Sequence, residues 1–120
     1  MLKLKIIPQV LEQANTGGVE GTILVNAEGS LLSSAGKNAA ETKSVAAIAS
    51  NVWNSYQNTA EGAGNLEFLS LVCERASIVV TSCGNFLLVL YGNGASFGMM
   101  KTKATALKRH LHEPLSTIAS

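Results

Sequence analysis

Apolar positions near the amino terminus recur with the period of an α-helix. Four of them occupy positions i, i+3, i+4 and i+7: Ile7, Val10, Leu11 and Ala14. This spacing predicts a short amphipathic helix over residues 5–15. We expect Pro8 near its first turn, where the missing amide hydrogen costs little. Thr16-Gly17-Gly18 should end the helix, because glycine readily adopts the positive φ common at helix termini.

Two further segments carry a helical pattern. Asn38 and Glu41 are spaced as a capping box, and helical spacing then continues through apolar residues. These are Val45, Ile48, Ala49, Val52, Trp53 and Tyr56. Nearer the carboxyl end, one face of a long predicted helix collects Met100, Ala104, Leu107, Leu111, Leu115 and Ile118. Pro114 lies within this helix, so we expect a kink or a break near residues 110–113.

The other apolar segments have the length and composition of β-strands. Residues 19–26 are rich in β-branched residues, and a turn leads from them into residues 30–35; three further β-rich segments are residues 66–73, 76–82 and 86–91. Residues 26–29 have turn chemistry, and only two or three residues separate the last three strands from one another. Such short connections predict that consecutive strands pair antiparallel.

The order helix, two strands, helix, three strands, helix (αββαβββα) indicates an α+β domain. We expect a five-stranded antiparallel sheet covered by helices on both faces, and one domain over residues 1–120. Residues 86–91 are apolar on both faces, which favours a central place beside residues 19–26. The short turns then give the strand order 2-1-5-4-3.

The two predicted edge strands differ in how well they resist pairing with another chain. Residues 30–35 are short and contain three serines, which makes them a poor template for a further strand. Residues 66–73 are long and apolar, with no proline or lysine, so they lack the usual protection of an edge. Either a loop of this chain covers that edge, or a strand of another chain pairs with it. We favour pairing.

The second predicted helix supports this choice. Beside its core stripe, a face carries small residues that permit close approach of another helix, together with one tryptophan: Ala46, Ala49, Ser50 and Trp53. The alternative is that this helix merely buries one broad face against its own sheet. The predicted partner interface combines the helix with the edge strand and consists of Val45, Ala46, Ala49, Ser50, Val52, Trp53, Leu66, Phe68, Leu69 and Leu71.

Charge and composition exclude several classes of partner. Nine Lys and Arg against eight Asp and Glu give a formal net charge of +1 at pH 7, so no strong field attracts nucleic acid. The longest nearly uninterrupted apolar run, residues 86–91, is far below the roughly 20 residues of a membrane span. Two cysteines and no Asn-x-Ser/Thr sequence favour a reducing, cytosolic setting. We therefore expect no nucleic acid partner and no direct membrane insertion.

Candidate chemistry is sparse. Cys73 and Cys83 stand at strand ends in apolar surroundings, which favours buried, inert thiols over a reactive thiolate. His110, His112 and Glu113 resemble a fragment of a zinc site, but the sequence offers no second cluster of ligands. We expect no catalytic residue, no metal site, no cofactor and no enzymatic activity.

Two surface features near the last helix have ordinary explanations. The glycine-rich residues 92–98 precede this helix but match neither the dinucleotide fingerprint nor the P-loop, which favours a connector with a helix cap. Lys101, Lys103, Lys108 and Arg109 form a modest basic patch that suits a solvated helix face. Binding of a phosphate-bearing partner to this basic patch is the alternative that the sequence leaves open.

Five segments together resemble the roadblock-domain family, and within it the adaptor subunits of the Ragulator complex. They are residues 9–19 (QVLEQANTGGV), 28–32 (EGSLL), 46–53 (AAIASNVW), 97–104 (FGMMKTKA) and 113–115 (EPL). The resemblance implies a roadblock/profilin-like fold and a heterodimer with a neighbouring roadblock subunit, the MEK-binding partner. In such dimers the second helices pack together and the third strands join two sheets into one.

The resemblance further implies a role in signalling. In the family, this pair belongs to a complex that a lipid-anchored subunit holds on late endosomes and lysosomes. There it recruits Rag GTPases for TOR signalling and supports MAP kinase signalling. Residues 37–42 and 55–64 depart from the family pattern, which leaves their outer contacts open.

Two other interpretations remain. A homodimeric roadblock module, such as a dynein light chain or a regulator of a small GTPase, would also be non-catalytic. An enzyme using Cys73 or Cys83 with His110 is disfavoured, because no base or oxyanion loop can be placed beside either thiol.

Overall fold

The computed structural model of the chain describes residues 2–26, 28–36, 39–59, 68–73, 76–94 and 96–119. Within these parts, helices and strands follow in the predicted order αββαβββα. The helices are α1 (Leu2–Glu12), α2 (Ala39–Thr59) and α3 (Phe97–Ala119). The strands are β1 (Val19–Asn26), β2 (Leu31–Gly36), β3 (Phe68–Val72), β4 (Ser77–Cys83) and β5 (Phe86–Gly92).

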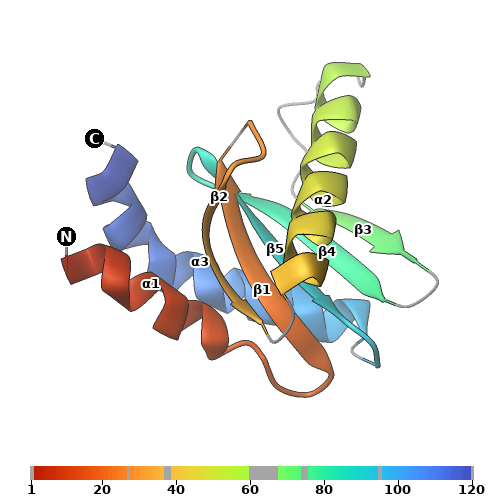
Figure 1. Ribbon diagram of the computed structural model, residues 1–120, viewed down its shortest axis with the longest axis horizontal. Coiled ribbons are helices and arrows are strands. Elements are labelled where there is room, and N and C mark those ends of the chain that lie inside the picture. Colours follow the sequence, from red (N-terminus) through yellow and green to blue (C-terminus); the bar gives the residue numbers. More distant parts are fainter. Residues whose placement is uncertain are drawn as a thin grey trace.

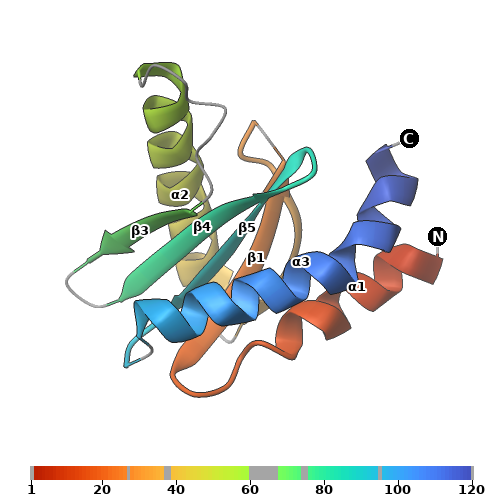
Figure 2. The ribbon, with the colours of Figure 1, turned by 180° about the vertical axis from the view of Figure 1, so that it is seen from behind.

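The strands form one antiparallel sheet in the order β2-β1-β5-β4-β3, which confirms the predicted fold class and strand order. Helix α2 crosses one face of the sheet, in front of it in Figure 1. Helices α1 and α3 lie side by side on the other face (Figure 2). The α+β sandwich therefore has three layers, with a core on each side of the sheet.

Central strand β5 contributes to both cores because its side chains alternate between the two faces. Leu88 and Leu90 pack with residues of α1 and α3, while Leu87, Val89 and Tyr91 pack with residues of α2. All five are no more than 4% exposed. The continuous apolar run that predicted a central strand is thus explained by burial on both faces.

Helix α1 differs from the prediction at its beginning. It starts at Leu2 rather than Lys5, and Pro8 lies inside the helix instead of near its first turn. The exposed Pro8 side chain points away from the core, while Ile7 and Leu11 on either side are fully buried. Packing of these two residues outweighs the hydrogen bond that proline cannot donate.

Helix α3 is not broken at Pro114. It runs without interruption from Phe97 to Ala119, and its C-terminal part turns away from the direction of the rest (Figure 2). The outcome corresponds to a bend, the milder of the two predicted effects of proline. At the other end, the Ser96 hydroxyl accepts a hydrogen bond from the Met99 amide, as expected for a helix cap.

The junction between α1 and β1 is tied to α3 by one lysine. The Lys103 ammonium group donates hydrogen bonds to the Ala14 carbonyl, at 3.1 Å, and to the carbonyl and hydroxyl of Thr16. These acceptors follow the C-terminal end of α1, where a positive charge is favourable. This residue, predicted to be part of a solvated basic face, is therefore a structural contact between two segments.

Candidate interaction surface

Strand β3 is the edge of the sheet on the side opposite β2. Among the described strands it pairs only with β4, with Leu71 opposite Ile78 and Leu69 opposite Val80. Figure 1 shows it beyond β4, with no described element on its outer side. The predicted edge position of this strand is confirmed.

One hydrogen bond determines which backbone groups of β3 face outward. The Cys73 amide donates to the Ala76 carbonyl at 2.8 Å, so the backbone N–H and C=O of Cys73 point toward β4. In an antiparallel ladder, residues alternate between bonding to one neighbour and bonding to the other. Leu69 and Leu71 therefore bond to β4. The amides and carbonyls of Phe68, Ser70 and Val72 point away from the sheet.

Side chains of β3 contribute to both faces next to this edge. Leu69 and Leu71 pack against the α2-side core, and Phe68 packs against the core beneath α3. The ammonium groups of Lys101 and Lys108 lie 5.1 and 5.9 Å from the centre of the Phe68 ring, within cation–π range. Val72, at the end of the strand, is 86% exposed, which is unusual for a large apolar side chain in a sheet.

The helix residues predicted for the interface are mostly buried within this chain. Five of these residues are no more than 6% exposed: Val45, Ala46, Ala49, Ser50 and Trp53. Four of them belong to the α2-side core, which shows that the small residues bring α2 close to its own sheet. Val52 is half-buried, and Leu66 lies outside the described residues. Their direct contact with a partner stays a prediction.

A different face of α2 is open. Ile48 and Tyr56 share the helical spacing of the buried apolar residues of α2 but are 44% and 53% exposed. With the half-buried Val52 they occupy positions i, i+4 and i+8, which form a stripe along one side of the helix. The apolar residues of α2 span more of its circumference than one sheet can bury. We call Ile48, Val52 and Tyr56 the α2 stripe.

Two members of the α2 stripe, Ile48 and Val52, lie on the flank of α2 away from the β1–β2 turn, and β2 is at the opposite edge of the sheet from β3. Ser50 lies on the opposite flank, where its hydroxyl is so close to Gly29 in the β1–β2 turn that a Cβ there would lie 2.8 Å from it. Ile48 and Val52 are each two positions from Ser50, which is about 200° around the helix. They therefore point away from the β1–β2 turn. The one sequence signal for this open face of α2 was that apolar residues occupy more of the helix circumference than a single buried stripe needs.

The two cysteines differ. Cys83 is buried, and burial raises the pKa of its thiol above 9.0, although the charge of Lys108 acts in the opposite direction. Cys73 is exposed, so the prediction that both thiols are buried is wrong for this one. Its place after the last residue of the edge strand leaves its side chain open to solvent.

Other candidate chemistry remains dispersed. His110 and His112 are both exposed, and the side chains of the described residues include no cluster of three His, Cys, Asp or Glu able to hold a metal ion. In the part of the chain that is described, none of the helices has the length and hydropathy needed to cross a membrane. The β3 edge and the α2 stripe are thus the main candidate surface.

Residues 8–91 match the Roadblock/LC7 domain. The chain belongs to this family. A Caenorhabditis elegans relative, the Ragulator complex protein LAMTOR2 homolog, is 36% identical over 126 residues, covering 99% of this chain and 97% of the relative. The resemblance stated from the sequence is confirmed.

Solved structures show the same fold. MglB from Myxococcus xanthus superposes with a TM-score of 0.79 at 20% identity, over 95% of this chain and 90% of that one. A Roadblock/LC7 domain from Streptomyces avermitilis gives a TM-score of 0.78 at 15% identity, over 91% and 97% of the two chains. The roadblock fold is therefore shared by proteins of very different sequence.

Proposed function

We propose that this chain is a non-enzymatic scaffold subunit that pairs with another roadblock domain through β3 and the α2 stripe. The observation that carries the proposal is the row of outward backbone groups at Phe68, Ser70 and Val72. An exposed apolar edge of this kind favours strand addition, because each outward amide and carbonyl gains a partner. Val72 at its end supplies an apolar side chain.

The α2 stripe supports a second contact in the same interface. Its two most exposed members are Ile48 and Tyr56, and Ile48 lies on the flank of α2 away from the β1–β2 turn. A helix from the partner can pack along this stripe while the partner's strand extends the sheet. The buried residues of α2, among them Ala49 and Trp53, hold the helix at the right height above the sheet.

The proposed contact surface joins residues found from sequence with residues found from structure. From the sequence come Val52, Phe68, Leu69 and Leu71, all half-buried in the single chain. From the structure come the exposed apolar residues Ile48, Tyr56 and Val72. Apolar groups left partly open in this way are typical of surfaces that a partner covers.

The similarity to a Ragulator complex protein supports a specific setting. In this setting the chain takes the place of the second Ragulator subunit and pairs with a roadblock subunit like the MEK-binding partner. A lipid-anchored subunit holds the assembly on late endosomes and lysosomes. The assembly recruits Rag GTPases for TOR signalling and supports MAP kinase signalling.

Sedimentation tests the pairing. We expect the chain alone to be poorly soluble or to form weak homodimers, and to form a stable one-to-one complex with a roadblock partner. The complex should weaken about tenfold or more when Ile48 is replaced by arginine. A chain that stays monomeric at every concentration and also in the presence of the partner would contradict the proposal.

A homodimeric roadblock module is the second candidate. The outward backbone groups of Phe68, Ser70 and Val72 can pair equally well with those of a second, antiparallel copy of β3 about a twofold axis. In this case the chain alone should dimerise tightly, and adding the roadblock partner should not displace the homodimer.

A further inference from the structure

The opposite edge of the sheet borders a groove with its own chemistry. Strand β2 pairs only with β1 among the described strands. At the end of β2 a groove of about 640 Å³ opens between the C-terminal end of α1, residues 34–36 and the first turn of α2. This groove is on the far side of the sheet from β3, so it is separate from the surface proposed for pairing.

Backbone groups of β2 point into the space beyond the sheet. The Asn26 amide donates to the Ser30 carbonyl at 2.9 Å, which shows that Asn26 faces β2. By alternation along β1, Thr22 also faces β2, where its partner is Ala35. The residues on either side of Ala35, Ser34 and Gly36, therefore direct their amides and carbonyls outward, and both line the groove.

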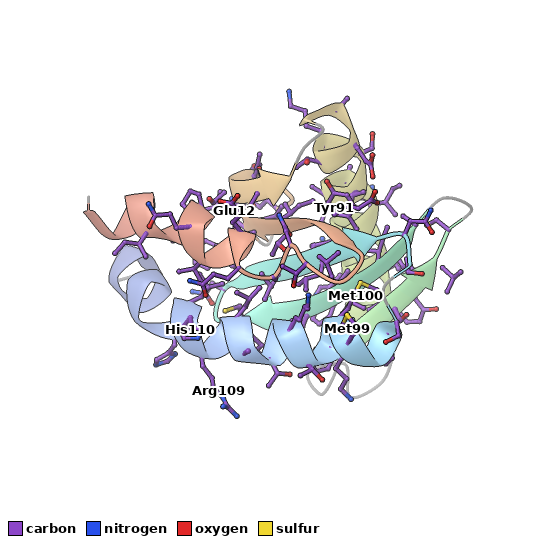
Figure 3. All side chains as sticks on the ribbon, turned by 90° about the horizontal axis from the view of Figure 1, so that it is seen from below. Glu12, Tyr91, Met99, Met100, Arg109 and His110 are labelled. Atoms are coloured by element: carbon purple, nitrogen blue, oxygen red, sulfur yellow. The ribbon has the colours of Figure 1, made fainter. Side chains whose placement is uncertain are left out.

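The walls of the groove carry negative charge. Glu12 at the end of α1 and Glu20 in β1 are both exposed there, and Glu41 in the first turn of α2 also lines it. Among the described lining residues none is a lysine or an arginine. Figure 3 shows Glu12 and Tyr91, which come from different sides of the groove, both on the side of the molecule away from α3.

The part of the groove nearest the sheet is held in place by internal hydrogen bonds. In the Asn15 side chain, Nδ2 donates to the Ala35 carbonyl at 2.9 Å and Oδ1 accepts from the Thr22 hydroxyl at 2.9 Å. Beside it, the Tyr91 hydroxyl lies 3.2 Å from the Thr42 hydroxyl. The Asn15 contacts tie the segment after α1 to β1 and β2, and the Tyr91–Thr42 contact ties β5 to the first turn of α2. The groove therefore needs little rearrangement to accept a ligand.

We propose that this groove binds an extended basic segment of a partner polypeptide. The backbone of the segment pairs with Ser34 and Gly36, and its lysine or arginine side chains contact Glu12 and Glu20. Short, serine-rich β2 was predicted to be a poor template for a full strand, but this proposal uses only the outward backbone groups at its end, while charge complementarity selects the basic sequence. The proposal does not depend on pairing through β3.

A titration with defined peptides tests this inference on the full chain. The probe is a short peptide of alternating arginine and valine, and amide chemical shifts report where it binds. We expect saturable shifts at Ser34 and Gly36. The double variant Glu12→Lys/Glu20→Lys should weaken binding about tenfold, because both favourable charges become repulsive. The control Glu28→Lys makes the same substitution at the other end of β2 and should leave affinity unchanged; at equal net charge it is compared with Glu12→Lys and Glu20→Lys taken singly.

Three outcomes would overturn the proposal. One is equal affinity of the double variant and the Glu28→Lys control. Another is binding by spermine that causes the same shifts, because this linear polyamine carries positive charge but has no peptide amides or carbonyls to pair with β2. The third is full affinity of a peptide methylated on alternate amides. Glu12→Gln/Glu20→Gln removes the two negative charges without adding positive ones. It tests the same loss of affinity if the lysine variant does not fold.

Discussion

The Cys73 amide donates a 2.8 Å hydrogen bond to the Ala76 carbonyl, and this contact sets the alternation of the whole edge strand. It follows that Leu71 bonds to β4 whereas its neighbours Ser70 and Val72 offer their backbone to solvent or to a partner. This alternation makes the proposed association testable one residue at a time.

Proline at successive positions of β3 should separate association from folding. Ser70→Pro removes an outward amide, so the chain should fold with nearly unchanged stability but lose affinity for its roadblock partner. Leu71→Pro removes an amide that bonds to β4, and it should destabilise the fold by about 1–3 kcal/mol or more. Urea unfolding and sedimentation with the partner measure the two effects. Equal loss of stability in both variants would contradict the assigned alternation.

Arginine substitutions on α2 should map its open face. Ile48→Arg places a charge in the α2 stripe, and we expect association to weaken about tenfold or more, since a buried unpaired charge is costly at an interface. Ala47→Arg is the matched control, because Ala47 is also exposed but lies on another side of the helix. Both chains should unfold at similar temperatures. Weakening by Ala47→Arg alone would assign the interface to the other face.

Trp53 should contribute to stability of the single chain. Its side chain is 2% exposed in the core between α2 and the sheet. Trp53→Ala should cost about 3–5 kcal/mol of unfolding free energy, through lost burial and the cavity that remains. Denaturation of the chain at low concentration, where it is unpaired, measures this cost. A stability loss seen only in the presence of the partner would indicate an interface role instead.

The two thiols should differ in reactivity and in their effect on stability at high pH. Cys73 is exposed and should react readily with iodoacetamide, whereas Cys83 should react only after unfolding. Because burial raises the pKa of Cys83 above 9.0, the unfolded chain releases its proton first as pH rises. The neutral Cys83 thiol therefore contributes fully to the free energy of unfolding below about pH 9, and this contribution is lost as the pH rises past that value. Labelling and urea unfolding at two pH values check both expectations.

Much of the fold could be predicted because pattern and turn length agree. The five strands and their order followed from short connections and from one strand that is apolar on both faces. The beginning of α1 could not be predicted, since the tertiary burial of Ile7 and Leu11 outweighs a local rule about Pro8.

The candidate site was predicted only in part for a similar reason. The edge position of β3 follows from topology, which sequence can supply. Which side of α2 remains open depends on how closely the helix approaches the sheet, and that distance is set by Ala46 and Ala49 in the core. Helical spacing alone could not separate Ala49, fully buried, from Ile48, almost half exposed.

Hydrogen exchange at single amides tests pairing through β3 most directly. The amides of Ser70 and Val72 should exchange quickly in the dilute chain and become protected when the roadblock partner is added. Those of Leu69 and Leu71, bonded to β4, serve as internal controls and should be protected in both states. Protection of Ser70 and Val72 that does not change in a formed complex would contradict strand pairing at this edge.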